Sequence, residues 1–128
     1  MKIQELRIGN KVSFKDTVVE IAGVSGIAYS FGAIDVTIFR GGKTEMHDLK
    51  TLSPIPLTEE ILLKCGFDEN MVLSTIEGEI RYYGDGDINI GGEDSCTLGM
   101  VYIAKCKYLH QLQNLYFALT GKELEVRQ

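Results

Sequence analysis

The stretch that most constrains the fold of this chain is Tyr108–Gly121, YLHQLQNLYFALTG. At about 100° per residue, a helix over this stretch has one broad apolar side of the kind that faces a protein core. The residues on that side are Tyr108, Leu112, Leu115, Tyr116 and Leu119. Gly121 can adopt the left-handed conformation that commonly ends a helix. The sequence therefore predicts an amphipathic helix that stops at Gly121.

The opposite side of this helix is polar but carries no charge, although 24% of the chain is charged. Its residues are His110, Gln113, Asn114 and Phe117. A helix face in water normally carries charged side chains. Two interpretations follow. Gln111 and Asn114 hydrogen-bond to neighbouring backbone within the domain, or this side is a second buried face that contacts another subunit or a partner.

Length and composition indicate a folded protein of modest size. With 128 residues and 45% hydrophobic side chains, the chain suits one compact unit built as two lobes. The net charge of −5 and the pI near 5.0 do not favour nucleic acid or an anionic membrane as a partner. Three cysteines without paired spacing and an N-terminus without a signal peptide lead us to expect a cytoplasmic protein.

Residues 1–53 show the pattern of a small β lobe that follows an initial turn at Leu6–Asn10. Alternating or β-branched stretches predict four or five short strands. Four of them are at Lys11–Lys15, Thr17–Ile21, Ile34–Arg40 and Thr44–Leu49. Lys15-Asp16 and Gly41-Gly42 are turn signals, and Gly23 and Gly26 suggest a loose connection between strands. Short strands joined by tight turns predict a small bent sheet or a partly closed β-barrel.

Residues 54–128 form the second predicted lobe, since Ser53-Pro54-Ile55-Pro56 interrupts the strand pattern. A short helix is expected between the N-cap Thr58 and the terminating Gly66. Four strands of an antiparallel meander then follow, at Met71–Ile76, Glu79–Tyr83, Asp87–Ile90 and Leu98–Ala104. The C-terminal helix would pack on the meander, and Leu124 and Val126 suggest a short final strand. The predicted fold class is α+β.

Three blocks of this chain carry a resemblance to a known family. They are Leu6–Asn10 (LRIGN), Pro54–Phe67 (PIPLTEEILLKCGF) and Tyr108–Gly121. The chain resembles a family of small proteins from gut anaerobic bacteria and their prophages, and the last block is the family's most distinctive one. The resemblance implies a bacterial or prophage origin. The resemblance implies no activity and no catalytic residues.

The sequence offers only incomplete forms of several catalytic or metal-binding patterns. Asp85-Gly-Asp87-Ile-Asn89 resembles the start of a calcium loop, but Ile90 stands where the turn requires Gly. Cys106 and His110 share a helical spacing, yet two ligands are too few for a structural zinc. Neither Cys106 nor Cys96 lies in a known nucleophile signature, and buried cysteine is the simpler interpretation. We therefore expect no catalytic residue, no metal and no cofactor.

The leading functional hypothesis from the sequence is a non-catalytic protein–protein interaction module. Its contact surface would be the uncharged helix side, His110, Gln113, Asn114 and Phe117, with an unidentified protein or a second copy of the chain as partner. The alternative is a nucleic-acid accessory protein that uses the first lobe, where Tyr29, Phe31 and Phe39 could stack on bases. Its basic residues would be Lys11, Lys15, Arg40 and Lys43.

Overall fold

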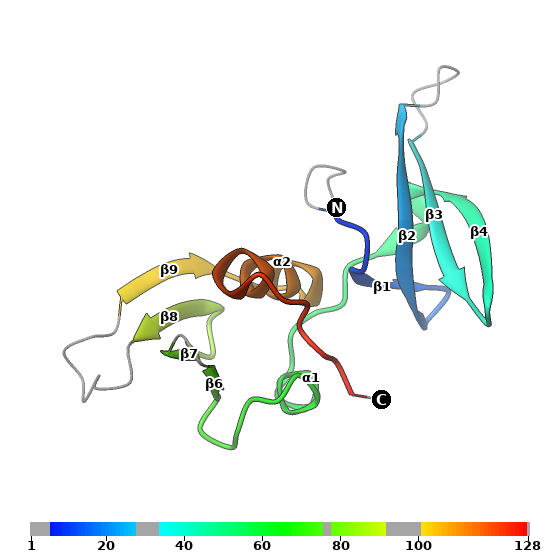
Figure 1. Cartoon of the computed structure of the whole chain (residues 1–128). Coiled ribbons are helices and arrows are strands. Elements are labelled where there is room, and N and C mark those ends of the chain that lie inside the picture. The colour runs from blue at the N-terminus through cyan, green and yellow to red at the C-terminus, as the bar shows by residue number, and fades with distance from the viewer. Residues whose placement is uncertain (1–5, 28–33, 76–77, 92–100, 128) are drawn as a thin grey trace. The chain divides into compact units, whose positions relative to one another are not determined.

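The computed structural model describes residues 6–75, without 28–33, and residues 78–127, without 92–100. Figure 1 traces its two antiparallel sheets and its helices. By internal contacts the chain divides into two units. The first unit combines Met1–Pro56 with Tyr108–Leu115, and the second combines Leu57–Lys107 with Tyr116–Gln128. The mixed architecture confirms the predicted α+β class.

The first unit contains a five-stranded antiparallel sheet in the order β4-β3-β2-β1-β5. Its strands are β1 (Lys11–Phe14), β2 (Thr17–Ile27), β3 (Ile34–Arg40), β4 (Lys43–Asp48) and β5 (Leu52–Ser53). A short 3-10 helix, η2 (Leu49–Thr51), precedes β5. The β1–β2 and β3–β4 hairpins turn at the two predicted positions, because Lys15, Asp16, Gly41 and Gly42 all have positive φ.

The sheet is bent but is not a closed barrel, since the described parts of β4 and β5 do not pair. The bend brings the rings of Phe14 in β1 and His47 in β4 to a centroid distance of 4.3 Å. In a flat sheet, three steps of about 4.8 Å would separate these strands. β5 is only two residues long, and Pro54, which has no N–H to donate, follows it directly.

One face of this sheet forms the core of the first unit. Its buried side chains alternate along the strands, as the period of a pleated sheet requires. They are Val12, Phe14, Val19, Ile21, Val36, Ile38 and Leu52, with Leu6 and Leu49 packed against them. A fully buried Val or Ile stabilises the fold by roughly 1.5–3 kcal/mol.

The expected break at Gly23 and Gly26 was wrong. Both residues lie inside β2, which continues to Ile27 and pairs with β3 through register shifts between Ile21 and Gly23 and between Val24 and Ile27. A glycine within a strand suits such irregular pairing, because it accepts the changed backbone geometry. The two glycines therefore mark bulges rather than a loop.

The second unit begins with the short helix α1 (Glu59–Lys64), whose two ends match the sequence. Thr58 caps its N-terminus, with the hydroxyl accepting from Ile61 N at 3.2 Å. Gly66 has φ of 100°. Phe67 N donates to the carbonyl of Leu62 at 3.1 Å, which completes a Schellman ending.

A four-stranded antiparallel sheet in the order β6-β7-β8-β9 follows. The strands are β6 (Val72–Thr75), β7 (Gly78–Tyr82), β8 (Asp87–Gly91) and β9 (Val101–Lys105). The buried apolar side chains of this unit are Leu62, Cys65, Phe67, Val72, Ile80, Ile88, Cys106 and Leu124. The suggested final strand at Leu124–Val126 is not formed. Instead, Arg127 N donates to the carbonyl of Lys64 at 2.8 Å.

The predicted C-terminal helix is α2 (Leu109–Thr120), and Gly121 follows it with φ of 74°. Its start is fixed by Gln111, whose Oε1 accepts from Tyr108 N at 3.2 Å. This bond is half of a capping box, and it replaces the missing polar N-cap. The described part of the chain has no helix that is long and apolar enough to cross a membrane.

Candidate functional site

The uncharged side of α2 is turned largely into the protein. Gln113 is only 2% exposed, and its side-chain amide makes two bonds to the backbone that leads into β1. Its Oε1 accepts from Lys11 N at 2.8 Å, and its Nε2 donates to the carbonyl of Gly9 at 3.2 Å. The amide thus provides hydrogen-bond partners for the Lys11 N–H and the Gly9 carbonyl, as the backbone of a neighbouring strand would.

Asn114 extends this amide network to two further side chains of the first unit. Its Oδ1 accepts from Asn10 Nδ2 at 2.8 Å and from Arg7 Nε at 3.1 Å. Asn10 is fully buried, and its own Oδ1 accepts from Arg7 N at 2.7 Å. The polar groups on the inner part of the helix therefore bond mainly to the initial turn, with side chains as well as backbone as partners.

The other two proposed contact residues of the helix differ sharply in exposure. His110 is 0% exposed, and its ring stacks on that of Tyr108 at a centroid distance of 6.1 Å. Phe117 is 40% exposed. The four residues predicted as one contact surface are thus two buried side chains, one half-buried side chain in the amide network, and one exposed ring.

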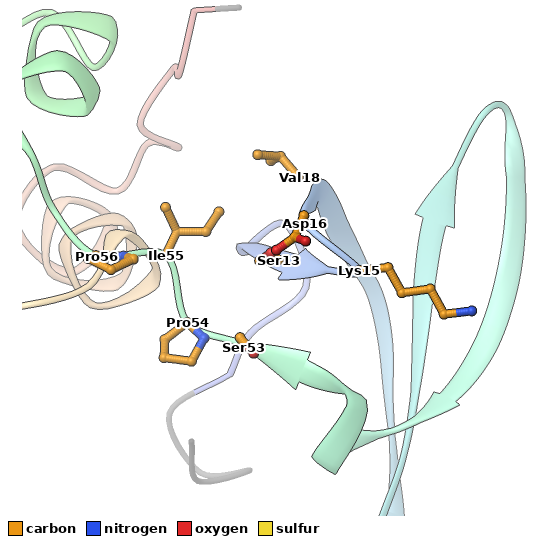
Figure 2. A pocket seen from close by; sticks show the side chains of 8 residues that line it. All are labelled: Ser13, Lys15, Asp16, Val18, Ser53, Pro54, Ile55 and Pro56. Atoms are coloured by element: carbon orange, nitrogen blue, oxygen red, sulfur yellow. The ribbon is translucent and has the colours of Figure 1, made fainter.

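The first unit also has a groove of about 390 Å³ on the outer side of β1. Ser53 of β5, Ser13 of β1 and Val18 of β2 are neighbours there, because Ser13 pairs with both of the others. Figure 2 shows Ile55 on one side of this groove and Val18 with Asp16 on the other, while the Lys15 side chain points away. Pro54 and Pro56 complete the wall. The groove combines apolar walls with hydroxyl groups and one carboxylate.

The basic residues nominated for nucleic acid do not form a single surface. Lys15 Nζ and Arg40 Cζ each lie 5.3 Å from the centroid of the Phe14 ring, and Lys43 stands opposite Arg40 in the β3–β4 register. Lys11 belongs to the other face of the sheet, where its Nζ lies 3.6 Å from Glu20. Of the nominated aromatic residues, Phe39 is exposed, and Tyr29 and Phe31 lie outside the described residues.

A carboxylate offsets part of the positive charge beside Phe14. Glu45 lies 3.0 Å from His47 Nε2 and 3.1 Å from Arg40 Nη2. The hydrogen bond to His47, assisted by Arg40, lowers the pKa of the Glu45 carboxyl, so Glu45 is negatively charged at neutral pH. The cluster around Phe14 is therefore mixed in charge rather than strongly basic.

Two of the three thiols are buried in the second unit. Burial raises the pKa of both Cys65 and Cys106 from 9.0 to about 11, because a thiolate is poorly solvated there. Both are therefore protonated at neutral pH and poor nucleophiles. Cys96 lies outside the described residues.

The described residues contain no group of three or more His, Cys, Asp or Glu side chains that could hold a metal ion. In the calcium-like stretch, Asp85 Oδ1 accepts from Asp87 N at 3.2 Å, as in a tight turn. The Asp87 carboxylate lies 3.4 Å from Lys105 Nζ. Asp87 and Asn89 stand on one face of β8, the alternation that a strand imposes.

No family model, no curated protein and no solved structure matches the chain. Functional inference therefore depends on the geometry of the described residues.

Neither the groove nor the exposed outer face of the first sheet was predicted from the sequence. One signal was available in the pairs Val18-Val19 and Ile38-Phe39, where consecutive apolar residues interrupt the alternation. Adjacent residues of a strand face opposite sides, so one apolar side chain of each pair must point outward. Val18 and Phe39 are those residues, and both are exposed.

The buried thiols predict a specific loss of stability at alkaline pH. A raised folded-state pKa stabilises the fold below the unfolded pKa, and this contribution is lost as pH rises through the folded pKa. The free energy of unfolding should therefore decrease between about pH 9 and about pH 11 more steeply in the wild type than in Cys65→Ala/Cys106→Ala. Urea titrations of both proteins across this range measure the difference. Parallel pH profiles would contradict the assignment of protonated, buried thiols.

Proposed function

We propose that the protein is a non-catalytic protein–protein interaction module of bacterial or prophage origin that acts in the cytoplasm. Its contact surface is the outer face of the first sheet. The observation that carries the proposal is that three large apolar side chains stand exposed there, on β2, β3 and β4. They are Val18, Phe39 and Met46. Exposed apolar groups gathered on one face are typical of protein contact sites.

The strand register places these three side chains as neighbours. Glu20 pairs with Phe39, and Thr37 pairs with Met46. Val18 is two positions from Glu20 on β2, so Val18 is a diagonal neighbour of Phe39. Thr37 is two positions from Phe39 on β3, so Met46 is the diagonal neighbour of Phe39 on the other side. The apolar groups therefore follow a diagonal across three strands.

Polar side chains and the groove complete this surface. Lys11 and Glu20 form an ion pair of 3.6 Å beside Phe39. Val18 belongs both to the apolar diagonal and to the groove, so the groove of about 390 Å³ adjoins the diagonal. An apolar centre with a polar rim is the usual composition of a protein interface. The groove supplies a concave position for an apolar anchor of the partner.

The protonated, buried thiols support a role without catalysis, since nucleophilic cysteine chemistry needs an accessible thiolate. The burial of His110 and Gln113 favours the sheet face over the helix as the contact surface. Phe117 on the helix is exposed to nearly the same degree as Phe39, at 40% against 46%. The two side chains can therefore be compared directly as alternative contact sites.

The test compares Phe39→Glu with Phe117→Glu. Sedimentation velocity over a range of concentrations measures self-association. Affinity capture from the native host, followed by rebinding of the purified captured protein, measures hetero-association. Phe39→Glu should keep its circular dichroism spectrum but weaken association about a hundredfold, because a charge is buried without a partner. Phe117→Glu should associate like the wild type.

Two results would contradict this proposal. If Phe117→Glu abolished association while Phe39→Glu left it intact, the helix would be the contact surface. If the wild type were monomeric and no captured protein rebound in purified form, the interaction function itself would fail.

Nucleic-acid binding by the first sheet is the second candidate. It is supported by Lys15 and Arg40, which converge on Phe14, and by Lys43, which stands opposite Arg40. Glu45 offsets part of this charge. Any affinity for a phosphate backbone would therefore be weak and salt-dependent.

This candidate predicts that Lys15→Glu/Lys43→Glu binds single-stranded DNA or RNA about tenfold or more weakly than the wild type at low salt. The control, Lys11→Glu/Lys122→Glu, changes the charge equally and should retain binding. Fluorescence anisotropy with a labelled oligonucleotide at several salt concentrations measures both. If the wild type shows no binding at low salt, the candidate is excluded.

A further inference from the structure

The second sheet presents a different kind of outer face, formed by two rows of side chains on β7, β8 and β9. Asp87 pairs with Lys105, and Tyr83 N donates to the carbonyl of Asp87 at 2.9 Å, which places Tyr83 at the end of that row. In the second row, Asn89 pairs with Arg81 on one side and with Tyr102 on the other. A concavity of about 550 Å³ lies on this face, lined by Tyr83, Asp87, Asn89, Tyr102 and Lys105.

The two tyrosines of this face are well exposed and stand at diagonal corners. Tyr102 is 55% exposed and Tyr83 is 42% exposed. With strands about 4.8 Å apart and about 3.4 Å per residue along a strand, their backbones are separated by roughly 12 Å. Each offers a flat apolar ring with a hydroxyl at its edge. The two rings can therefore support two separate groups of one elongated ligand.

The charged side chains on this face are paired with one another. Asp87 lies 3.4 Å from Lys105, and Arg81 lies 3.9 Å from Glu79. The two acidic and two basic groups on the strands cancel, and Asp85, in the turn that adjoins Lys105, adds one negative charge. The face therefore lacks the excess of cations that a phosphate backbone requires, and its surplus of a single carboxylate is small for a basic peptide.

Hydrogen-bonding groups remain between the two rings. The Asn89 amide provides both a donor and an acceptor, the Asp87 carboxylate provides acceptors, and the Lys105 ammonium provides donors. Adjacent hydroxyl groups of a sugar act as donor and acceptor together, so they match this mixture. The C–H face of a pyranose ring packs on an aromatic ring.

We propose that the outer face of β7–β9 is a binding site for a neutral oligosaccharide. Tyr83 and Tyr102 support two rings of one chain, and Asn89, Asp87 and Lys105 bond to the hydroxyl groups between them. The concavity is open rather than enclosed, so a weak complex is expected. This site is separate from the interface proposed on the first sheet, and neither depends on the other.

The test is a titration of the ¹⁵N-labelled full chain, followed by NMR, with three neutral hexasaccharides: maltohexaose, cellohexaose and chitohexaose. At least one should cause saturable shifts of the backbone amides in β8 and β9. Tyr102→Ala and Asn89→Ala should each weaken that binding by about tenfold. Tyr102→Phe keeps the ring and should retain most of the affinity.

Phe39→Ala is the matched control, because Phe39 is a similarly exposed aromatic residue on the other sheet. It should bind the saccharide like the wild type. The proposal is overturned if none of the three hexasaccharides gives saturable shifts at about 10 mM. It is also overturned if Phe39→Ala and Tyr102→Ala weaken binding equally, or if a thymidine hexanucleotide binds these residues more tightly than every sugar.

Discussion

The attachment of residues 109–115 of α2 to the rest of the first unit depends on the hydrogen bonds of the Gln113 amide. An amide on α2 bonds to the backbone of Gly9 and Lys11, and so fixes the helix to the first turn and first strand. The same turn is held from the other side, where Gly9 N donates to Ile21 and Ile21 N donates to Asn10. Because an unsatisfied buried backbone group is costly, this arrangement permits little displacement of residues 109–115 of the helix within the first unit. It also explains why the helix side facing the turn is polar but uncharged: amides can satisfy both a donor and an acceptor, whereas an ionised side chain would need a compensating charge.

The two proposed binding faces follow from the alternation of side chains along the strands of each sheet. In the first sheet one face forms the core, and in the second sheet Ile80 and Ile88 are buried on the face opposite to Tyr83 and Tyr102. On the first sheet the outer face carries apolar side chains with an ion pair, which suits contact with another protein. On the second sheet the outer face carries two tyrosines among paired charges and an amide, which suits a polar, uncharged ligand. On the polar side of α2, which the sequence predicted as a contact surface, Gln113 and Asn114 bond to Gly9, Asn10 and Lys11 of the first unit.

Local chemistry determined which features could be predicted from the sequence. Thr58, Gly66 and the Gly41-Gly42 turn act through contacts within a few residues, and the structure has each as predicted. The bulges at Gly23 and Gly26 were predicted to be a loose connection between strands. A glycine is compatible with both a bulge and a loop, and only the pairing of β2 with β3 distinguishes them. The partners of Asn114 were not predictable, because Asn10 is 104 positions away along the chain. For the same reason the sequence could not place Tyr83 and Tyr102 on one face before the register of β7–β9 was known.

The central claim, that the Gln113 amide replaces a strand partner for the initial turn, is tested most directly by the free energy of unfolding of Gln113→Leu. Leucine has nearly the same size but cannot bond, so the Lys11 N–H and the Gly9 carbonyl lose their partner. Urea denaturation should show a loss of about 2 kcal/mol or more. Gln111→Leu, which removes only the local bond at the helix start, should lose about 1 kcal/mol. If Gln113→Leu were as stable as the wild type, the amide would not hold the helix to the turn, and the account of the first unit would be wrong.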